Sequence, residues 1–169
     1  MKIVAATDHT KRSAAAGLAL KLWPEHTRSE MEADLKEHCQ AGGVVFLAQE
    51  ENSLIGFAQC GLRHDYVEGA YTSPVGYLEG IYVEPTFRRC GVAAELVRAC
   101  EAWARARGCS EFASDTEAEN VRSIHFHLSV GFQEANRVVC FLFCLFCKFF
   151  CLSLFCSFLF LCNRNSLIF

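Results

Sequence analysis

The sequence lacks the segments that would mark a secreted, nucleotide-binding or metal-binding protein. Residues 1–6 contain one lysine and no apolar run long enough for a secretory signal, so we expect a cytoplasmic chain. No Gly-Lys-Ser or Gly-Lys-Thr is present, which excludes a Walker motif, and no Gly-x-Gly-x-x-Gly run indicates a dinucleotide fold. His125 and His127 are two positions apart and cannot share a helix face, so we predict no metal site.

Acidic residues are missing from the end of the chain, and basic residues are in the minority before it. All 19 acidic residues lie at or before Glu134, whereas only Lys148 and Arg164 are charged after residue 140. Up to residue 140 the 14 basic residues leave a net charge of −5, compared with −3 for the whole chain. An acidic body argues against nucleic acid as a partner and suits a cationic substrate.

The eleven cysteines do not follow the pattern of a disulfide-stapled secreted domain. Five are scattered singly through the body, as free thiols in a reducing compartment would be, and six lie between residues 140 and 162. Cys144 and Cys147 have the spacing of metal ligands, but a second pair and a nearby histidine are missing, so we do not predict zinc there.

Hydrophobic periodicity predicts an α+β domain with the element order β-α-α-β-β-β-α-β-α-β. Ser13 is the expected cap of the first helix, and Ser29 with Glu32 is the expected capping box of the second. Strands are expected at residues 2–6, 44–49, 54–62, 77–83, 111–114 and 137–141. Helices are expected at residues 13–22, 29–40, 93–107 and 120–130.

The run Arg88-Arg89-Cys90-Gly91-Val92-Ala93 is the most informative motif of the chain. It follows the apolar strand at 77–83 and a proline, and it opens the long helix at 93–107. The first N–H groups of a helix have no partner inside it, the helix dipole favours an anion there, and glycine allows close approach. The run therefore predicts a phosphate-binding turn, with a solvated, arginine-rich helix end as the alternative.

This run resembles the (Gln/Arg)-x-x-Gly-x-(Gly/Ala) signature of GNAT acetyltransferases. Ser73–Val83, Phe112–Asp115 and Gly131–Glu134 more closely resemble aminoglycoside 6'-N-acetyltransferases of that superfamily. The likeness runs from about Lys2 to Phe141 and implies a GNAT acyltransferase domain over residues 1–141. It also implies a mixed, mostly antiparallel sheet flanked by helices, acetyl-CoA as cosubstrate, an aminoglycoside antibiotic as acetyl acceptor, drug resistance and a homodimer.

The resemblance implies a site for acetyl-CoA along the central strand and the helix that follows. The pyrophosphate would lie on the turn formed by Arg88, Arg89, Cys90, Gly91, Val92 and Ala93. The pantetheine arm would take backbone hydrogen bonds from Ile81, Tyr82 and Val83. Asn120 would also contact acetyl-CoA, although it is equally suited to cap the helix that it begins, and one side chain could do both.

Two carboxylates are the predicted catalytic residues. Alternation places Glu79 on the face of Ile81 and Val83, opposite Leu78, and a carboxylate there is costly unless it pairs with a buried arginine or is functional. Asp115 ends a short strand, where it either caps a turn or serves the site. The resemblance implies that Glu79 contacts the drug. It also implies that Asp115 binds the amine as a general base, directly or through water.

Four further residues are predicted to bind the substrate because the resemblance places drug contacts at their positions. Trp23 and His26 lie in one loop and Tyr66 lies in another, where an aromatic ring suits stacking on a charged sugar. Trp23 could instead plug the core at a helix end, and His26 could be merely solvated. At Asn136 the resembling family usually has an acidic residue, so this chain has lost a charge there. Asp65 is expected to be a rim charge.

Residues 142–169 form an atypical tail rich in Phe, Leu and Cys. Its apolar composition fits a membrane helix or a buried extension of the last strand. It also fits a frameshifted or read-through end, because Phe, Leu and Cys share T-rich codons. We favour the frameshift, and we expect membrane association only if the tail is a genuine anchor. Two other functions remain open: acetylation of another amine, such as a polyamine or peptide, and a defective or tail-anchored product.

Overall fold

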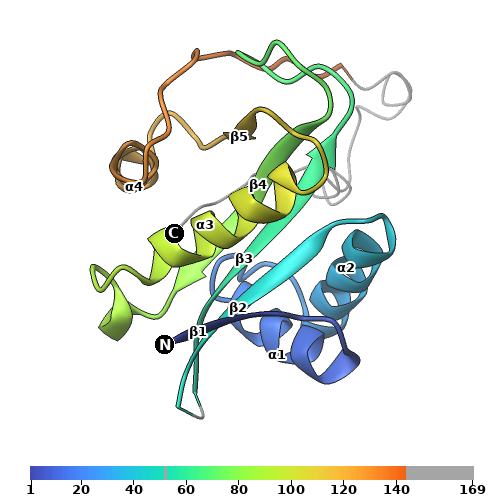
Figure 1. Ribbon diagram of the computed structural model, residues 1–169, viewed down its shortest axis with the longest axis vertical. Helices are drawn as coiled ribbons and strands as arrows, with labels where there is room; N and C mark the ends of the chain where they lie inside the picture. The colour runs from blue at the N-terminus through green and yellow to red at the C-terminus, as the bar shows by residue number, and fades with distance from the viewer. Residues whose placement is uncertain (52, 144–169) are drawn as a thin grey trace, which may run out of the picture.

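Five strands form one mixed sheet in the order β1-β2-β3-β4-β5 in a computed structural model that describes residues 1–51 and 53–143 (Figure 1). Neighbouring strands from β1 to β4 are antiparallel, and β5 runs parallel to β4. The α+β class and the mixed, mostly antiparallel sheet are confirmed. The strands are β1 (Lys2–Ala5), β2 (Val44–Glu50), β3 (Ser53–Arg63), β4 (Val75–Val83) and β5 (Phe112–Ser114).

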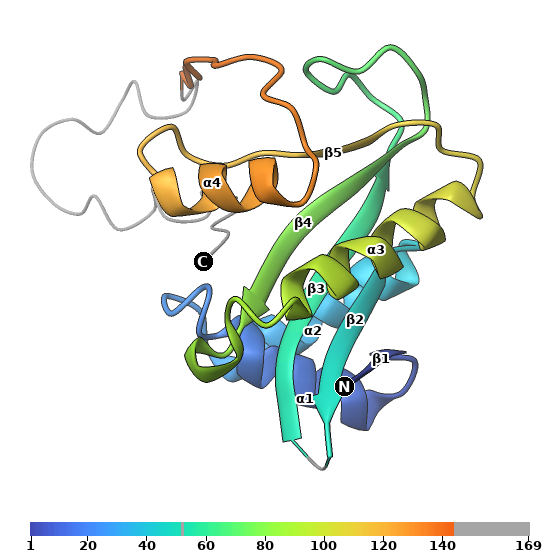
Figure 2. The same cartoon turned by 60° about the vertical axis from the view of Figure 1, so that its left-hand side comes forward.

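Helices cover both faces of the sheet. Two pack on one face and a third packs on the other, while the fourth lies beside β5, apart from the first two (Figures 1 and 2). A short 3₁₀ turn, Pro85–Phe87, joins the end of β4 to the third helix. The helices are α1 (His9–Ala19), α2 (Arg28–Gln40), α3 (Val92–Arg105) and α4 (Val121–Ser129).

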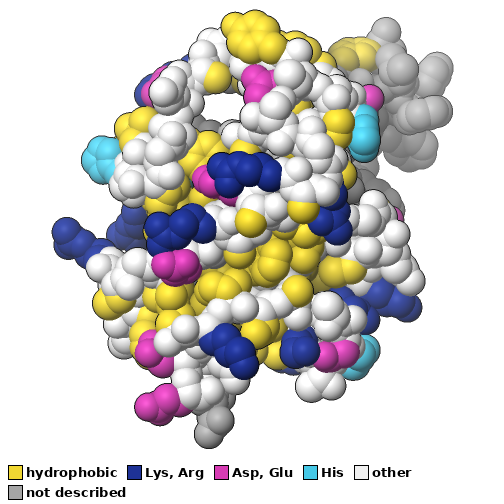
Figure 3. All heavy atoms as spheres, in the orientation of Figure 1, with side chains coloured by type: hydrophobic (Ala, Val, Ile, Leu, Met, Phe, Trp, Pro, Cys, Tyr) yellow, Lys and Arg dark blue, Asp and Glu magenta, His cyan; other side chains and the backbone are white. Residues whose placement is uncertain are grey.

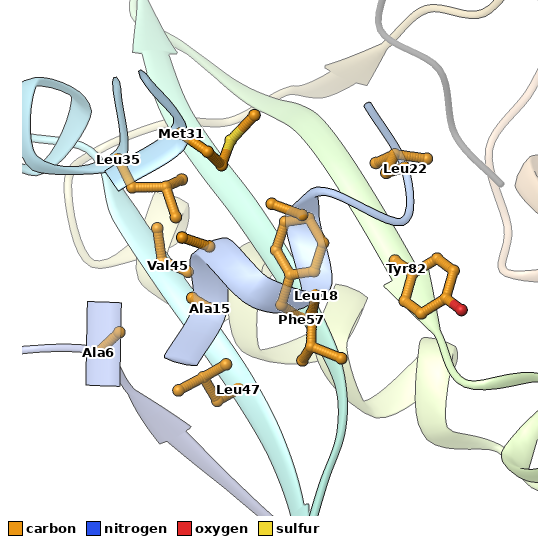
Figure 4. Close-up of a cluster of buried hydrophobic side chains, with 12 residues drawn as sticks. Ala6, Ala15, Leu18, Leu22, Met31, Leu35, Val45, Leu47, Phe57 and Tyr82 are labelled. Carbon is orange, nitrogen blue, oxygen red and sulfur yellow. The ribbon is translucent and has the colours of Figure 1, made fainter. Parts of the chain in front are cut away.

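The first core lies between the sheet and the helices α1 and α2 (Figure 4). Leu18 and Leu35 from the helices meet Leu47 and Phe57 from the sheet, and all four side chains are buried. Burying side chains of this size contributes about 1.5–3 kcal/mol each. This core fixes the start of the chain against β2 and β3.

The second core lies between the sheet and α3. Leu96 and Val97 of the helix pack on Leu78, Ile81 and Val83 of β4, and all five side chains are almost completely buried. On the face seen in Figure 1, hydrophobic side chains show between charged side chains of both signs (Figure 3). The packing anchors α3, and with it the turn before the helix, to the second half of β4.

A β-bulge in β4 overturns the predicted alternation around Glu79. Gly80 pairs with Gln59 and Leu78 pairs with Cys60, so Glu79 is the extra residue of the bulge. Leu78 therefore shares a face with Ile81 and Val83, not with Gly80 and Tyr82. A bulge inserts one residue and re-aims its neighbours, so the period-two pattern of the sequence does not continue through it.

The caps of the first two helices differ from the predicted ones. Asp8, not Ser13, caps α1, and its carboxylate accepts a hydrogen bond from the Lys11 amide at 2.8 Å. Thr27 with Glu30 forms the capping box of α2, whereas Ser29 lies inside the helix. Both helices begin earlier than predicted, because a capping side chain that precedes the predicted one in the sequence already accepts hydrogen bonds from their first amides.

The predicted strand at 137–141 is not formed, since residues 132–143 lie outside any helix or strand. Val139 and Phe141 are among the large hydrophobic side chains exposed in this segment. The tail residues 144–169, including Cys144 and Cys147, lie outside the described residues. None of the helices in the described ranges is long and apolar enough to cross a membrane.

Candidate active site

The strands β4 and β5 part in the middle of the sheet. Their pairing ends at Leu78 and Ser114, whereas β4 continues to Val83. The Ser114 hydroxyl lies 3.0 Å from the Leu78 carbonyl oxygen and 3.1 Å from Nε2 of the buried His127, so side chains mark the point of divergence. Beyond it, residues 81–83 turn one strand edge towards the gap, where a ligand with amide groups can pair with backbone.

A turn of left-handed residues precedes α3 at the far end of β4. Arg89 has a φ of 63° and Gly91 has a φ of 82°, and Gly91 is the N-cap of the helix without a side-chain cap. Left-handed residues between extended or helical ones aim successive N–H groups at one point, which forms an anion-binding concavity. Arg88 points back to the strand, where its Nε donates to the Val83 carbonyl at 2.9 Å. We call residues 88–93 the amide turn.

Four polar side chains meet on the first half of β4, and we call them the β4 cluster. Arg63 Nη2 lies 2.8 Å from Glu79 Oε2, and its guanidinium carbon lies 3.2 Å from the centre of the Tyr77 ring. The Tyr77 hydroxyl donates to Asp115 Oδ1 at 2.5 Å. Burial raises the pKa of the Tyr77 phenol, and the bond to the Asp115 carboxylate raises it further, so Tyr77 remains a donor.

Trp23 lies against β4 at Gly80, the residue after Glu79. A side chain at Gly80 would come within 2.5 Å of the Trp23 ring, so the glycine makes room for the indole. The ring also packs at 6.1 Å from that of Phe57 and is partly buried, which agrees with a core role at a helix end. His26 follows on a turn, where Nε2 lies 3.7 Å from a Glu25 carboxylate oxygen.

Tyr66 and Asn136 are brought together by a residue that the sequence did not single out. Glu68 accepts a hydrogen bond from the Tyr66 hydroxyl at 2.6 Å and another from the Asn136 amide at 2.8 Å. Both bonds lower the pKa of the Glu68 carboxyl, the one from Asn136 more strongly. We call these three residues the rim bridge; the Tyr66 side chain is 81% exposed.

Asn120 has the capping role that was one of its two interpretations. Its side-chain oxygen accepts a hydrogen bond from the Ser123 amide at 3.1 Å, at the start of α4. It lies just after β5 and Asp115, near the divergence of the strands. The remaining predicted residues other than Trp23 and His26 fall into three groups: Glu79 and Asp115 in the β4 cluster, Tyr66 and Asn136 in the rim bridge, and the amide turn with residues 81–83. Trp23 packs on β4 at Gly80, and the His26 ring pairs with Glu25.

Arg63, Tyr77 and Glu68 are the polar residues that the sequence reasoning missed. A signal for Arg63 existed, because one interpretation of Glu79 required an arginine partner. The antiparallel pairing of β3 with β4 is what brings the ends of these strands together, with Arg63 in register with Val75. Glu68 gave no signal, since it lies in an irregular loop whose path only the fold determines.

The described fold is that of an acyl-group transferase. A profile of the acetyltransferase (GNAT) family matches residues 12–132, and the chain therefore belongs to this family. The chain is 45% identical, over 73% of its length and 86% of the relative, to an aminoglycoside N(6')-acetyltransferase type 1 of Salmonella typhimurium. It is 44% identical to the Stenotrophomonas maltophilia enzyme of that name, over 76% of this chain and 84% of the relative.

A solved structure with the same architecture has been determined with a ligand. It is AAC(6')-Iy in complex with the bisubstrate analog CoA-S-monomethyl-acetylneamine. The TM-score is 0.79, the identity is 41%, and the match covers 83% of this chain and 95% of that one. A relative of this chain therefore holds the coenzyme and an aminoglycoside fragment in one ligand.

Proposed function

We propose that the protein transfers the acetyl group of acetyl-CoA to the 6'-amino group of aminoglycoside antibiotics and so confers resistance to them. The observation that carries the proposal is the position of Glu79 and Asp115 beside the divergence of β4 and β5. Carboxylates beside an aromatic ring suit a polycationic sugar, and relatives 44–45% identical bear the name of that activity. Acetylation removes the charge of the amine.

Acetyl-CoA supplies the activated acyl group, and the second half of β4 would form part of its binding site. The backbone edge of Ile81, Tyr82 and Val83 would pair with the two amides of the pantetheine arm, as a neighbouring strand would. The amide turn suits the pyrophosphate, because its N–H groups converge and the dipole of α3 adds to them. Arg88, Arg89 and Asn120 would complete this site.

The first half of β4 and the two loops would hold the aminoglycoside. Trp23 offers a partly buried ring against Gly80, on which a sugar could stack. His26, Tyr66 and Asn136 would contact the outer rings of the drug. In this arrangement the reacting amine reaches the acyl group directly, with both substrates bound at once.

Asp115 is the proposed general base. The 6'-ammonium must lose a proton before its nitrogen can attack, and a carboxylate within hydrogen-bond reach, or a water that it orders, can accept that proton. Asp115 is exposed, and Tyr77 holds one of its oxygens at 2.5 Å, which orients the group. Glu79 would hold the substrate cation nearby and so assist the same step.

We also propose that residues 1–141 form the catalytic domain, with residues 142–169 as an additional tail. A homodimer in the cytoplasm is the proposed state of the protein. The exposed apolar side chains before the tail, such as Val139 and Phe141, support the view that this end of the chain affects solubility more than chemistry.

The test is an assay of acetyl-CoA-dependent thiol release with kanamycin or tobramycin. We expect turnover by the full chain and by a variant that ends at Phe141, with thermal melts to show that both are folded. Activity in the shorter variant alone would mean that the tail spoils an intact site. Turnover with polyamines and none with either drug would contradict the proposal.

A further inference from the structure

The β4 cluster contains its own cation. Arg63 Nη2 lies 2.8 Å from one Glu79 oxygen and Nε lies 3.4 Å from the other, so the guanidinium spans both. Its carbon lies 3.2 Å above the Tyr77 ring, in the geometry of a cation–π contact. The Arg63 side chain is 40% exposed and that of Glu79 is 26% exposed, so solvent reaches the pair from one side.

A substrate ammonium needs the same oxygens that this cation occupies. Counted in formal charges, the Arg63 guanidinium cancels one of the two carboxylates of the cluster, Glu79 and Asp115. A fork of guanidinium donors matches a carboxylate better than a single ammonium does. The free site is therefore less attractive to a polycation than its two carboxylates alone would be.

We propose that Arg63 is a specificity-determining residue, a built-in counter-ion that a substrate ammonium must displace from Glu79. The proposal rests on the proposed function and adds a competition to it. The long arginine side chain can leave Glu79 and remain over the Tyr77 ring, which keeps part of its interaction. Glu79 is not left without a partner, because the incoming ammonium replaces the guanidinium.

The test is Arg63→Gln, which removes the competing charge and keeps a polar, though shorter, side chain. We expect the KM for kanamycin to fall about three- to fivefold, the range that partly exposed ion pairs support, while kcat changes less than about twofold. Arg63→Lys keeps the charge but loses the bidentate fork, so its KM should lie between those of the wild type and of Arg63→Gln. Arg105→Gln removes an equal charge from a pair with Glu101 at the far end of α3 and should leave KM unchanged.

Two further measurements separate this proposal from the assignment of the substrate. The fall in the KM for kanamycin caused by Arg63→Gln should disappear in a Glu79→Gln background, because the carboxylate for which the two cations compete is then absent. Calorimetric binding of kanamycin and of spermine in the presence of CoA should show the same gain in affinity without turnover. If the wild type acetylates neither kanamycin nor tobramycin, the proposed function fails. The calorimetric comparison of Arg63→Gln with the wild type still decides the role of Arg63. A KM or Kd that rises or stays unchanged in Arg63→Gln would overturn the proposal.

Discussion

Single side chains carry the proton transfer that the proposed reaction needs. Asp115 is exposed at the end of β5, and the Tyr77 hydroxyl fixes one of its oxygens. The Tyr77 phenol has a raised pKa and cannot take up the proton of the amine at neutral pH. Asp115 is therefore the group of this pair that can act as a base.

Asp115→Asn should lower kcat by about 100-fold or more, the usual contribution of a general base, because an amide cannot accept the proton. The Asn side chain can still take the hydrogen bond from Tyr77, so the fold around it should persist. Steady-state kinetics with kanamycin would measure the effect. Asp65→Asn, an exposed loop carboxylate outside the β4 cluster, is the matched control and should keep kcat within about twofold. Equal losses in both variants would argue for a general effect of charge instead.

At this scale the sequence named two of the four side chains of the β4 cluster, Glu79 and Asp115, but neither Arg63 nor Tyr77. The resemblance gave Trp23, Glu79 and Asp115, and the fold brings all three to the same strand. Arg63 could be foreseen only as an unnamed partner of Glu79. Its identity depends on the register between β3 and β4, which a periodic pattern does not define.

Among the elements, α3 is the one whose two ends can be compared directly. A glycine with positive φ stands at each end, Gly91 at 82° and Gly108 at 85°, and neither has an atom within 4 Å of where a Cβ would lie. The same substitution therefore imposes the same backbone strain at both. Only Gly91 belongs to the amide turn.

Gly91→Ala should raise the KM for acetyl-CoA about tenfold and leave the KM for kanamycin unchanged, because the strain of a left-handed alanine falls on the N–H groups of the turn. Gly108→Ala should leave both KM values unchanged. Each variant should lower the free energy of unfolding by about 1–2 kcal/mol, measured by urea denaturation. An equal rise of the acetyl-CoA KM in both variants would contradict the role of the turn.

The elements themselves were predicted well where the apolar periodicity is unbroken, and poorly where one residue interrupts the pattern. The helix after the amide turn and the strand β4 appeared as expected. The faces of β4 were assigned wrongly because a bulge at Glu79 shifts the alternation by one residue. The strand at 137–141 was expected from its apolar residues, but these residues lie outside any helix or strand, and the short β5 is the edge strand of the described sheet.

For the molecule as a whole, stability should depend on pH through His127. This side chain of α4 is buried against the end of β5, and its Nδ1 lies 2.8 Å from the Ser123 carbonyl oxygen of the same helix. Burial holds the pKa of its imidazole below the ordinary value of 6.5. The unfolded chain then binds more protons than the native state just below pH 6.5, so the free energy of unfolding falls as the pH falls through this window.

Urea denaturation of the wild type between about pH 7 and about pH 5 should show this loss, and His127→Gln should reduce the slope. The glutamine variant should be less stable throughout, because it cannot reproduce both contacts of the imidazole. His125→Gln removes an exposed histidine from the same helix and should keep the wild-type slope. A slope that survives in His127→Gln would assign the titration to another group.

The rim bridge also limits how the chain can change over generations. One carboxylate, Glu68, holds side chains from positions 66 and 136, so a change at either position alters the other. An acidic residue in place of Asn136 would face Glu68 as a like charge and would lose the hydrogen bond that the amide donates. A lineage that places an acidic residue at position 136 would therefore gain from a second change at position 68, far away in the gene, that removes the like charge.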